Sequence, residues 1–183
     1  MRKLTLSALF TALIAVLAQV AIPLPFSPVP LTGQVVGVML AGSLLGSRAG
    51  VLSIIAYLLL GAAGAPVFSL ARGGLYMLAG PTGGYLLGFI PAVYLTGWML
   101  EKVDQPTACR TAGAMLIALG FIYLFGGIQL GLIMRYNFTQ VILTGVVPFL
   151  APDLFKTVLA AFLSIRVKAS LHNNKLGHVL GNR

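Results

Sequence analysis

The stretch Val147-Pro-Phe-Leu-Ala-Pro-Asp-Leu-Phe-Lys-Thr-Val-Leu-Ala-Ala161 places a carboxylate, Asp153, and an ammonium, Lys156, inside a long apolar run. Charged side chains at membrane depth are costly, so they usually have a partner or a function. At positions i and i+3 of a helix the two side chains lie on one face and can neutralise each other. The stretch therefore predicts a membrane helix that carries a binding site. A structural ion pair that only pins the helix is the alternative.

The composition of the whole chain favours a membrane protein. Of its 183 residues, 58% are hydrophobic and 8% are charged, and the mean hydropathy is +0.99. A soluble domain of this size could not bury so much apolar surface, whereas a bilayer solvates it directly. The net charge of +9 is dispersed at the ends of apolar runs. This distribution is typical of membrane orientation and argues against nucleic acid as a partner.

Six apolar runs predict an all-α integral membrane protein that forms a single domain over residues 1–183. The expected helices cover residues 4–22, 32–45, 49–60, 83–100, 111–125 and 152–167, and residues 168–183 are expected to form a polar cytoplasmic tail. Several runs are shorter than the roughly 20 residues of a full span. The first run also resembles a signal peptide, but it is longer than a typical apolar region of one, and no small-x-small cleavage site follows. We therefore expect a retained first helix.

The distribution of basic residues predicts the orientation. With both termini in the cytoplasm, only Arg72 and Arg135 fall on the outer side, and Lys156 lies inside a span. The remaining basic residues are then cytoplasmic, as the positive-inside rule requires. These are Arg2, Lys3, Arg48, Lys102, Arg110, Arg166, Lys168, Lys175 and Arg183.

Two outward segments are unlike solvated linkers. Residues 23–34 contain four prolines and no charge, and residues 61–84 are rich in glycine and apolar residues. Proline restricts φ, and glycine lets a backbone approach a ligand closely. The composition fits lids folded back onto the protein, and it fits re-entrant structural turns equally well. A third outer segment is expected at about residues 126–150.

Four motifs in this order resemble one family of membrane proteins. They are Pro28-Val-Pro-Leu-Thr-Gly-Gln34, Gly64-Ala-Pro-Val-Phe68, Gly80-Pro-Thr-Gly-Gly-Tyr-Leu-Leu-Gly-Phe89 and Pro148-Phe-Leu-Ala-Pro-Asp-Leu-Phe-Lys156. Together they resemble the BioY family, the biotin-specific S component of energy-coupling-factor (ECF) vitamin transporters. The resemblance spans essentially the whole chain.

The resemblance implies a six-helix S-component bundle with outer lid loops, in the plasma membrane of a bacterium. Such a protein captures biotin from outside with high affinity and works with a membrane coupling subunit (T component) and two cytoplasmic ATPases. The chain itself has no Gly-x-x-x-x-Gly-Lys-Ser/Thr phosphate loop, so any ATP would be hydrolysed by the partners. No cofactor is expected in this chain.

The chemistry of biotin suits the residues of this chain. Its ureido ring has two N–H donors and one carbonyl acceptor, and an acceptor-only Asp153 and a donor-only Lys156 could satisfy opposite edges of it. Alternatively, Lys156 could hold the carboxylate, for which Arg72 is the other candidate. Further polar contacts are expected from the residues near the two outer segments, which are Thr32, Gln34, Tyr76 and Tyr85, and an apolar wall from Phe26, Phe68 and Leu75.

Simpler roles exist for several of these residues. Arg72 could extend along the membrane surface to the lipid headgroups, as long cationic side chains do. The tyrosines could equally belong to an interfacial aromatic belt.

Small residues on the first helix predict a partner surface. Ala8 and Ala12 lie on one face, and small-x-x-x-small spacing lets helix backbones pack closely in membranes. The spacing recurs elsewhere in the chain, so by itself it is generic. The resemblance to S components implies that Ala8 and Ala12 dock on the T component.

Three other readings compete with biotin capture. An S component for a different vitamin would share the scaffold. An intramembrane enzyme would need a nucleophile with a base, or a metal-ligand set, at membrane depth. The single cysteine, Cys109, is in a cytoplasmic loop and both histidines are in the tail, so neither an enzyme nor a metal site is expected. One Asp and one Lys cannot form the charged ring of a channel without oligomerisation.

Overall fold

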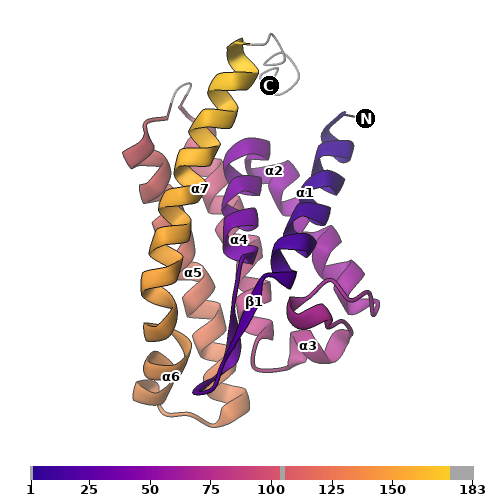
Figure 1. Ribbon diagram of the computed structural model, residues 1–183, viewed down its shortest axis with the longest axis vertical. Coiled ribbons are helices and arrows are strands. Elements are labelled where there is room, and N and C mark those ends of the chain that lie inside the picture. The colour runs from indigo at the N-terminus through magenta and orange to yellow at the C-terminus, as the bar shows by residue number, and fades with distance from the viewer. Residues whose placement is uncertain (1, 104–105, 174–183) are drawn as a thin grey trace.

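The computed structural model describes residues 2–103 and 106–173. Five long helices dominate it (Figure 1). They are α1 (Arg2–Gln19), α2 (Gln34–Ala62), α4 (Gly83–Glu101), α5 (Ala108–Met134) and α7 (Val147–Asn173). The smaller elements are strands β1 (Ala21–Leu24) and β2 (Ser27–Thr32), the 3-10 turn η1 (Ser69–Ala71), and helices α3 (Leu75–Ala79) and α6 (Phe138–Gly145).

Helix α2 consists of two halves that meet at Gly46. This glycine has φ +83° and ψ −178°, a conformation that L side chains rarely adopt. If the halves are counted separately, the long helical segments of the described chain number six, and the break lies between the predicted helices 32–45 and 49–60. The Glu101 carboxylate, at the end of α4, accepts hydrogen bonds from the Ser47 backbone N–H (2.6 Å) and hydroxyl (3.0 Å to Oε2). The carboxylate thereby gives a hydrogen-bond acceptor to a backbone N–H at the start of the second half of α2, where the helix itself provides none.

Several helices of the described chain differ from their predicted ranges. Helix α5 continues past 125 to Met134, because Gly126 and Gly127 interrupt neither its apolar run nor its helical backbone. It ends where Arg135 takes the left-handed conformation, with φ +55°. Helix α6 follows, with a capping box between Asn137 and Gln140. Helix α7 begins at Val147, before the predicted 152, because Pro148 is tolerated in a first turn.

The chain beyond residue 167 also differs from its prediction. Helix α7 continues to Asn173, so the predicted polar tail begins as helix. The side chains of both histidines, and residues 174–183 as a whole, lie outside the part of the chain that the structure describes.

The proline-rich segment forms an antiparallel hairpin, which the sequence analysis did not predict. Ala21 pairs with Thr32, Ile22 with Leu31 and Leu24 with Ser27, with one irregularity in the register. Prolines lack the N–H that a central strand needs, but they are tolerated in a two-stranded ribbon, where both strands are edges. In Figure 1 the hairpin runs along the bundle toward α6.

Small and hydroxyl-bearing residues hold the helices together. Ser7 donates to the Ala49 carbonyl at 3.0 Å and Thr11 to the Ser53 carbonyl at 2.9 Å, which ties α1 to the second half of α2. A side chain at Gly97 of α4 would overlap the backbone of α2 at Ser47. Such close approach replaces the hydrophobic effect as the source of packing energy between membrane helices.

The bundle has two distinct ends (Figure 1). The first turn of α1 and the last described turns of α7 lie at one end, whereas α3, α6 and the hairpin tip lie at the other. Helices α2, α4, α5 and α7 are long and apolar enough to cross a membrane, and Lys3–Gln19 is a shorter apolar helix. The predicted all-α membrane fold is confirmed, with the small hairpin as an addition.

Candidate functional site

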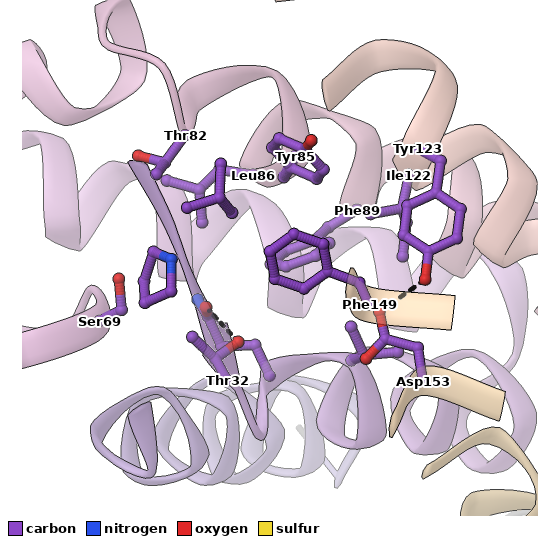
Figure 2. Close-up of a pocket in the computed structure, with 14 residues that line it drawn as sticks. Thr32, Ser69, Thr82, Tyr85, Leu86, Phe89, Ile122, Tyr123, Phe149 and Asp153 are labelled. Atoms are coloured by element: carbon purple, nitrogen blue, oxygen red, sulfur yellow. Dashed lines mark hydrogen bonds between the residues drawn. The ribbon is translucent and has the colours of Figure 1, made fainter. Parts of the chain in front are cut away.

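A cavity lies between the hairpin, the loop around η1, and helices α2, α4, α5 and α7 (Figure 2). Its wall combines aromatic and aliphatic groups with a few polar ones, as is usual for small-molecule sites. The lining residues are Val29, Pro30, Thr32, Gln34, Val35, Ser69, Thr82, Tyr85, Leu86, Phe89, Ile122, Tyr123, Phe149 and Asp153.

Asp153 is the charged residue of this wall, and only 4% of it is exposed. Its Oδ1 lies 2.8 Å from the Lys156 ammonium, and its Oδ2 accepts a hydrogen bond of 2.9 Å from the Tyr123 hydroxyl. Two carboxylate oxygens offer about four acceptor positions, so two remain after these contacts. Lys156 therefore neutralises the negative charge of the carboxylate, and the two contacts fix its orientation. The carboxylate can still accept hydrogen bonds from a molecule in the cavity.

Lys156 faces the base of the hairpin rather than the cavity. Its ammonium donates to Asp153 and, at 2.7 Å, to the backbone carbonyl of Thr32, the last residue of β2. It is not among the residues that line the cavity. The predicted pairing of Asp153 with Lys156 is present, and the lysine also joins α7 to the hairpin.

Thr32 and Gln34 line the cavity, as predicted for ligand contacts, and begin a chain of hydrogen bonds that leads away from it. The Thr32 hydroxyl donates to Gln34 Oε1 (3.0 Å), Gln34 Nε2 donates to the Tyr57 hydroxyl (2.6 Å), and Tyr57 donates to the Val67 carbonyl (3.0 Å). The chain links the hairpin to the loop that carries Ser69. One N–H of the Gln34 amide remains available, because that group has two.

Tyr85 was predicted to contact a ligand, and it lines the cavity. Its ring lines the cavity, while its hydroxyl donates to the Gly145 carbonyl at 2.8 Å. This hydrogen bond fixes the ring against the end of α6. Tyr85 thus presents its ring face rather than its hydroxyl to the cavity.

The other predicted contacts do not line the cavity. Phe68 is fully buried in the core, where it packs edge-on against Tyr57 with ring centroids 5.5 Å apart. Arg72 is exposed, and Tyr76 is 64% exposed. The predicted wall residues Phe26 and Leu75 are 59% and 71% exposed. Their direct contact with a ligand stays a prediction that this geometry does not favour.

Sequence reasoning missed several lining residues. Phe149 precedes Asp153 by four positions on α7, so helical periodicity could have found it. Tyr123 comes from α5, thirty residues before Asp153, and only the packing of α5 on α7 brings it close. Ser69 and Thr82 are also in the wall. No local signal marked either hydroxyl.

Ala8 and Ala12 lie on the exposed face of α1, next to Leu9 and Val16. The opposite face of the helix is buried against the bundle. Within the described part of the chain, no three His, Cys, Asp or Glu residues gather as they would to hold a metal ion.

The fold defines the class of protein, because it is the fold of the S components of ECF transporters. A solved structure described as the S-component for biotin from an ECF-type ABC transporter matches this one with a TM-score of 0.86 at 30% identity, and the match covers 91% of this chain and 90% of that chain. Residues 1–173 match the BioY family. The chain belongs to this family, so the resemblance seen in its sequence is confirmed.

Curated relatives agree with this assignment. The chain is 42% identical to the biotin transporter BioY of Thermotoga maritima, over 92% of this chain and 96% of that protein. It is 39% identical to the biotin transporter BioY of Rhizobium etli, over 88% of this chain and 90% of that protein. Both relatives are transporters rather than enzymes.

Proposed function

We propose that this chain is the membrane subunit that captures biotin for an ECF-type transporter. The observation that carries the proposal is the buried Asp153, which faces a largely apolar cavity under the hairpin. Its free acceptor positions suit the N–H groups of a ureido ring, and the surrounding aromatic and aliphatic groups suit the thiophane ring and valeryl chain. The names of the BioY relatives support the same ligand.

We infer the orientation of the chain in the membrane from the basic residues at the two ends of the bundle. Lys3, Arg110 and Arg166 belong to the end where α1 begins and α7 finishes, whereas Arg72 and Arg135 belong to the end with α3 and α6. The positive-inside rule places the more basic end in the cytoplasm. Both termini are then cytoplasmic in a bacterial plasma membrane, and the hairpin tip faces outward.

The partners would be a T component and two cytoplasmic ATP-binding subunits. The ECF type of the matching solved structure supports this assembly. On α1, the exposed face with Ala8 and Ala12 would dock on the T component, because small side chains permit close helix contact. The chain would act as a transport subunit and not as an enzyme.

Binding of [³H]biotin to the detergent-solubilised protein tests the ligand and the site together. We expect tight binding by the wild type, and a loss of at least tenfold in Asp153→Asn, because the amide no longer presents two acceptor oxygens. Lys156→Ala should also weaken binding, because it leaves the buried carboxylate without its counter-ion. Thermal unfolding of each variant separates lost binding from lost folding.

The outcomes distinguish the competing functions. Tight binding that survives both substitutions would keep biotin as the ligand and reduce the pair to a structural bridge. A folded wild type that binds no biotin would contradict the proposal, and would favour another vitamin on the same scaffold.

A further inference from the structure

The C-terminal end of α1 contacts two segments of the cavity wall, although no described residue of α1 lines the cavity itself. On one side, the Val20 carbonyl accepts a hydrogen bond from the Gly33 N–H at 3.0 Å, directly after the hairpin. On the other side, the Gln19 amide binds the loop around η1. Its Oε1 accepts from the Ala71 N–H at 2.9 Å, and its Nε2 donates to the Phe68 carbonyl at 3.3 Å.

The η1 turn that Gln19 binds has a strained backbone. Its residues Leu70 and Ala71 have φ of +61° and +53°, which residues with a side chain rarely adopt. Two such residues in succession cost free energy, and they persist only where their surroundings enforce the conformation. The Ala71 N–H belongs to this strained part, and its acceptor is Gln19. Loss of the Gln19 amide should therefore let the turn relax.

The start of the same loop is anchored on α2 and does not depend on Gln19. The Phe68 ring is fully buried and lies against Gly61, where a side chain would overlap it. The Tyr57 hydroxyl donates to the Val67 carbonyl at 3.0 Å. By contrast, the two strained residues that follow are exposed. Hydrophobic burial therefore holds the first part of the loop, and the contact with Gln19 holds the second.

The Gln19 amide is itself held in a fixed orientation. Its Nε2 also donates to the Ala15 carbonyl one turn earlier, at 3.1 Å, so both amide hydrogens have acceptors. The backbone of α1 is fixed as well, because Ser7 and Thr11 bind α2 and Ala18 is fully buried. A side chain oriented by a fixed helix can impose one conformation on a strained turn.

We propose that Gln19 is a positioning residue for the ligand cavity, which holds the η1 turn in place and couples the end of α1 to retention of the ligand. Gln19 does not touch the ligand in this proposal. It acts through the loop that contributes Ser69 to the cavity wall. The inference rests on the proposed function, because it takes biotin as the ligand that the wall retains.

The test measures biotin dissociation and backbone amide exchange in the detergent-solubilised protein. Gln19→Leu should release biotin about fivefold faster or more, because two hydrogen bonds to the turn are lost. The association rate and the thermal unfolding should stay close to those of the wild type, since Gln19 is exposed. A partly misfolded sample would instead bind fewer molecules and release them at the wild-type rate.

Amide exchange tests the position of the effect. Without ligand, residues 68–72 should exchange faster in Gln19→Leu than in the wild type. Biotin should slow exchange at residues 15–20 in the wild type and not in Gln19→Leu, because coupling between two sites is reciprocal. The matched control is Gln140→Leu, since Gln140 is also an exposed amide but makes its side-chain hydrogen bond within the capping box of α6. It should match the wild type in the release of biotin and in exchange at residues 68–72.

Each other result overturns the inference. If Gln19→Leu releases biotin at the wild-type rate, or leaves exchange at residues 68–72 unchanged, Gln19 does not position the turn. If biotin slows exchange at residues 15–20 equally in both proteins, the coupling does not depend on Gln19. Equal effects of Gln140→Leu would show that the loss is not specific to the turn. In all these cases wild-type biotin binding stands, and with it the proposed function.

A folded wild type that binds no biotin would contradict the proposed function. The comparison of exchange without ligand would then still decide whether Gln19 holds the η1 turn, so the two failures are distinguishable.

Discussion

At the scale of single residues, the orientation of the Asp153 carboxylate depends on donors from two helices. Lys156 lies on the same helix, but Tyr123 is on α5 and donates to Oδ2 at 2.9 Å. Because Tyr123 also lines the cavity, its hydroxyl both stabilises the negative charge and leaves fewer acceptor positions of the carboxylate open toward the cavity.

Tyr123→Phe should therefore weaken biotin binding. A hydrogen bond to a charged group contributes about 1.5–3 kcal/mol, which corresponds to roughly tenfold or more in affinity. If Tyr123 acts through Asp153, its removal should have little further effect in an Asp153→Asn background. Equilibrium biotin binding to both single variants and the double variant measures this coupling.

Tyr94→Phe is the matched control, because Tyr94 lies on α4, is 47% exposed and does not line the cavity. Its biotin affinity should equal that of the wild type. Additive losses in Tyr123→Phe and Asp153→Asn would contradict the coupling, and would make Tyr123 an independent contact or a packing residue.

The residues found from the sequence share a physical property. Asp153 and Lys156 are charges in an apolar run, and the cost of burying them makes them conspicuous. Tyr123 and Ser69, which line the cavity, carry no such signal, because a tyrosine or serine in a membrane helix or loop is common. Their positions in the cavity wall depend on contacts between segments distant in sequence, which periodicity does not reveal.

At the scale of elements, α1 has one face that is buried against α2 and one face that is exposed. Ser7 and Thr11 are buried and bind the backbone of α2, whereas Ala8 and Ala12 are exposed. A bulky residue on the exposed face would therefore leave the internal packing of the bundle intact.

Replacing both Ala8 and Ala12 with tryptophan should abolish biotin transport and co-purification with the T component, since the indole rings would separate the helices. Biotin binding by the isolated subunit should change less than twofold. Pull-down from membranes that contain all subunits, with binding measured in parallel, checks both statements.

The control places the same bulk on another exposed surface. Ile117 and Leu124 on α5 are 51% and 54% exposed, and their replacement by tryptophan should preserve co-purification. Unchanged co-purification of the α1 variant would show that Ala8 and Ala12 are not part of the interface with the T component.

The elements at the end of the bundle with α3 and α6 were the hardest to predict. Four prolines in residues 23–34 indicate an ordered loop, but the antiparallel pairing of Ala21 with Thr32 depends on backbone partners eleven residues apart. By contrast, the break at Gly46 was predictable, because a Gly-Ser-Arg sequence between two apolar runs has a local cause.

At the scale of the whole molecule, the two ends of the bundle differ in charge, and the orientation in the membrane depends on this difference. Cys109 offers a direct probe. It is the single cysteine of the chain, it is exposed, and it lies in the first turn of α5 next to Arg110. That turn belongs to the end of the bundle where α1 begins (Figure 1).

A membrane-impermeant maleimide should therefore label Cys109 in inverted membrane vesicles and not in right-side-out vesicles. The matched variant, Arg72→Cys in a Cys109→Ser background, carries its thiol at an exposed position near α3 and should show the opposite pattern. Labelling of Cys109 in right-side-out vesicles would show that the orientation is the opposite of the one proposed. The hairpin and the cavity would then face the cytoplasm, and capture of biotin from outside would be excluded by geometry, however tightly the protein bound it.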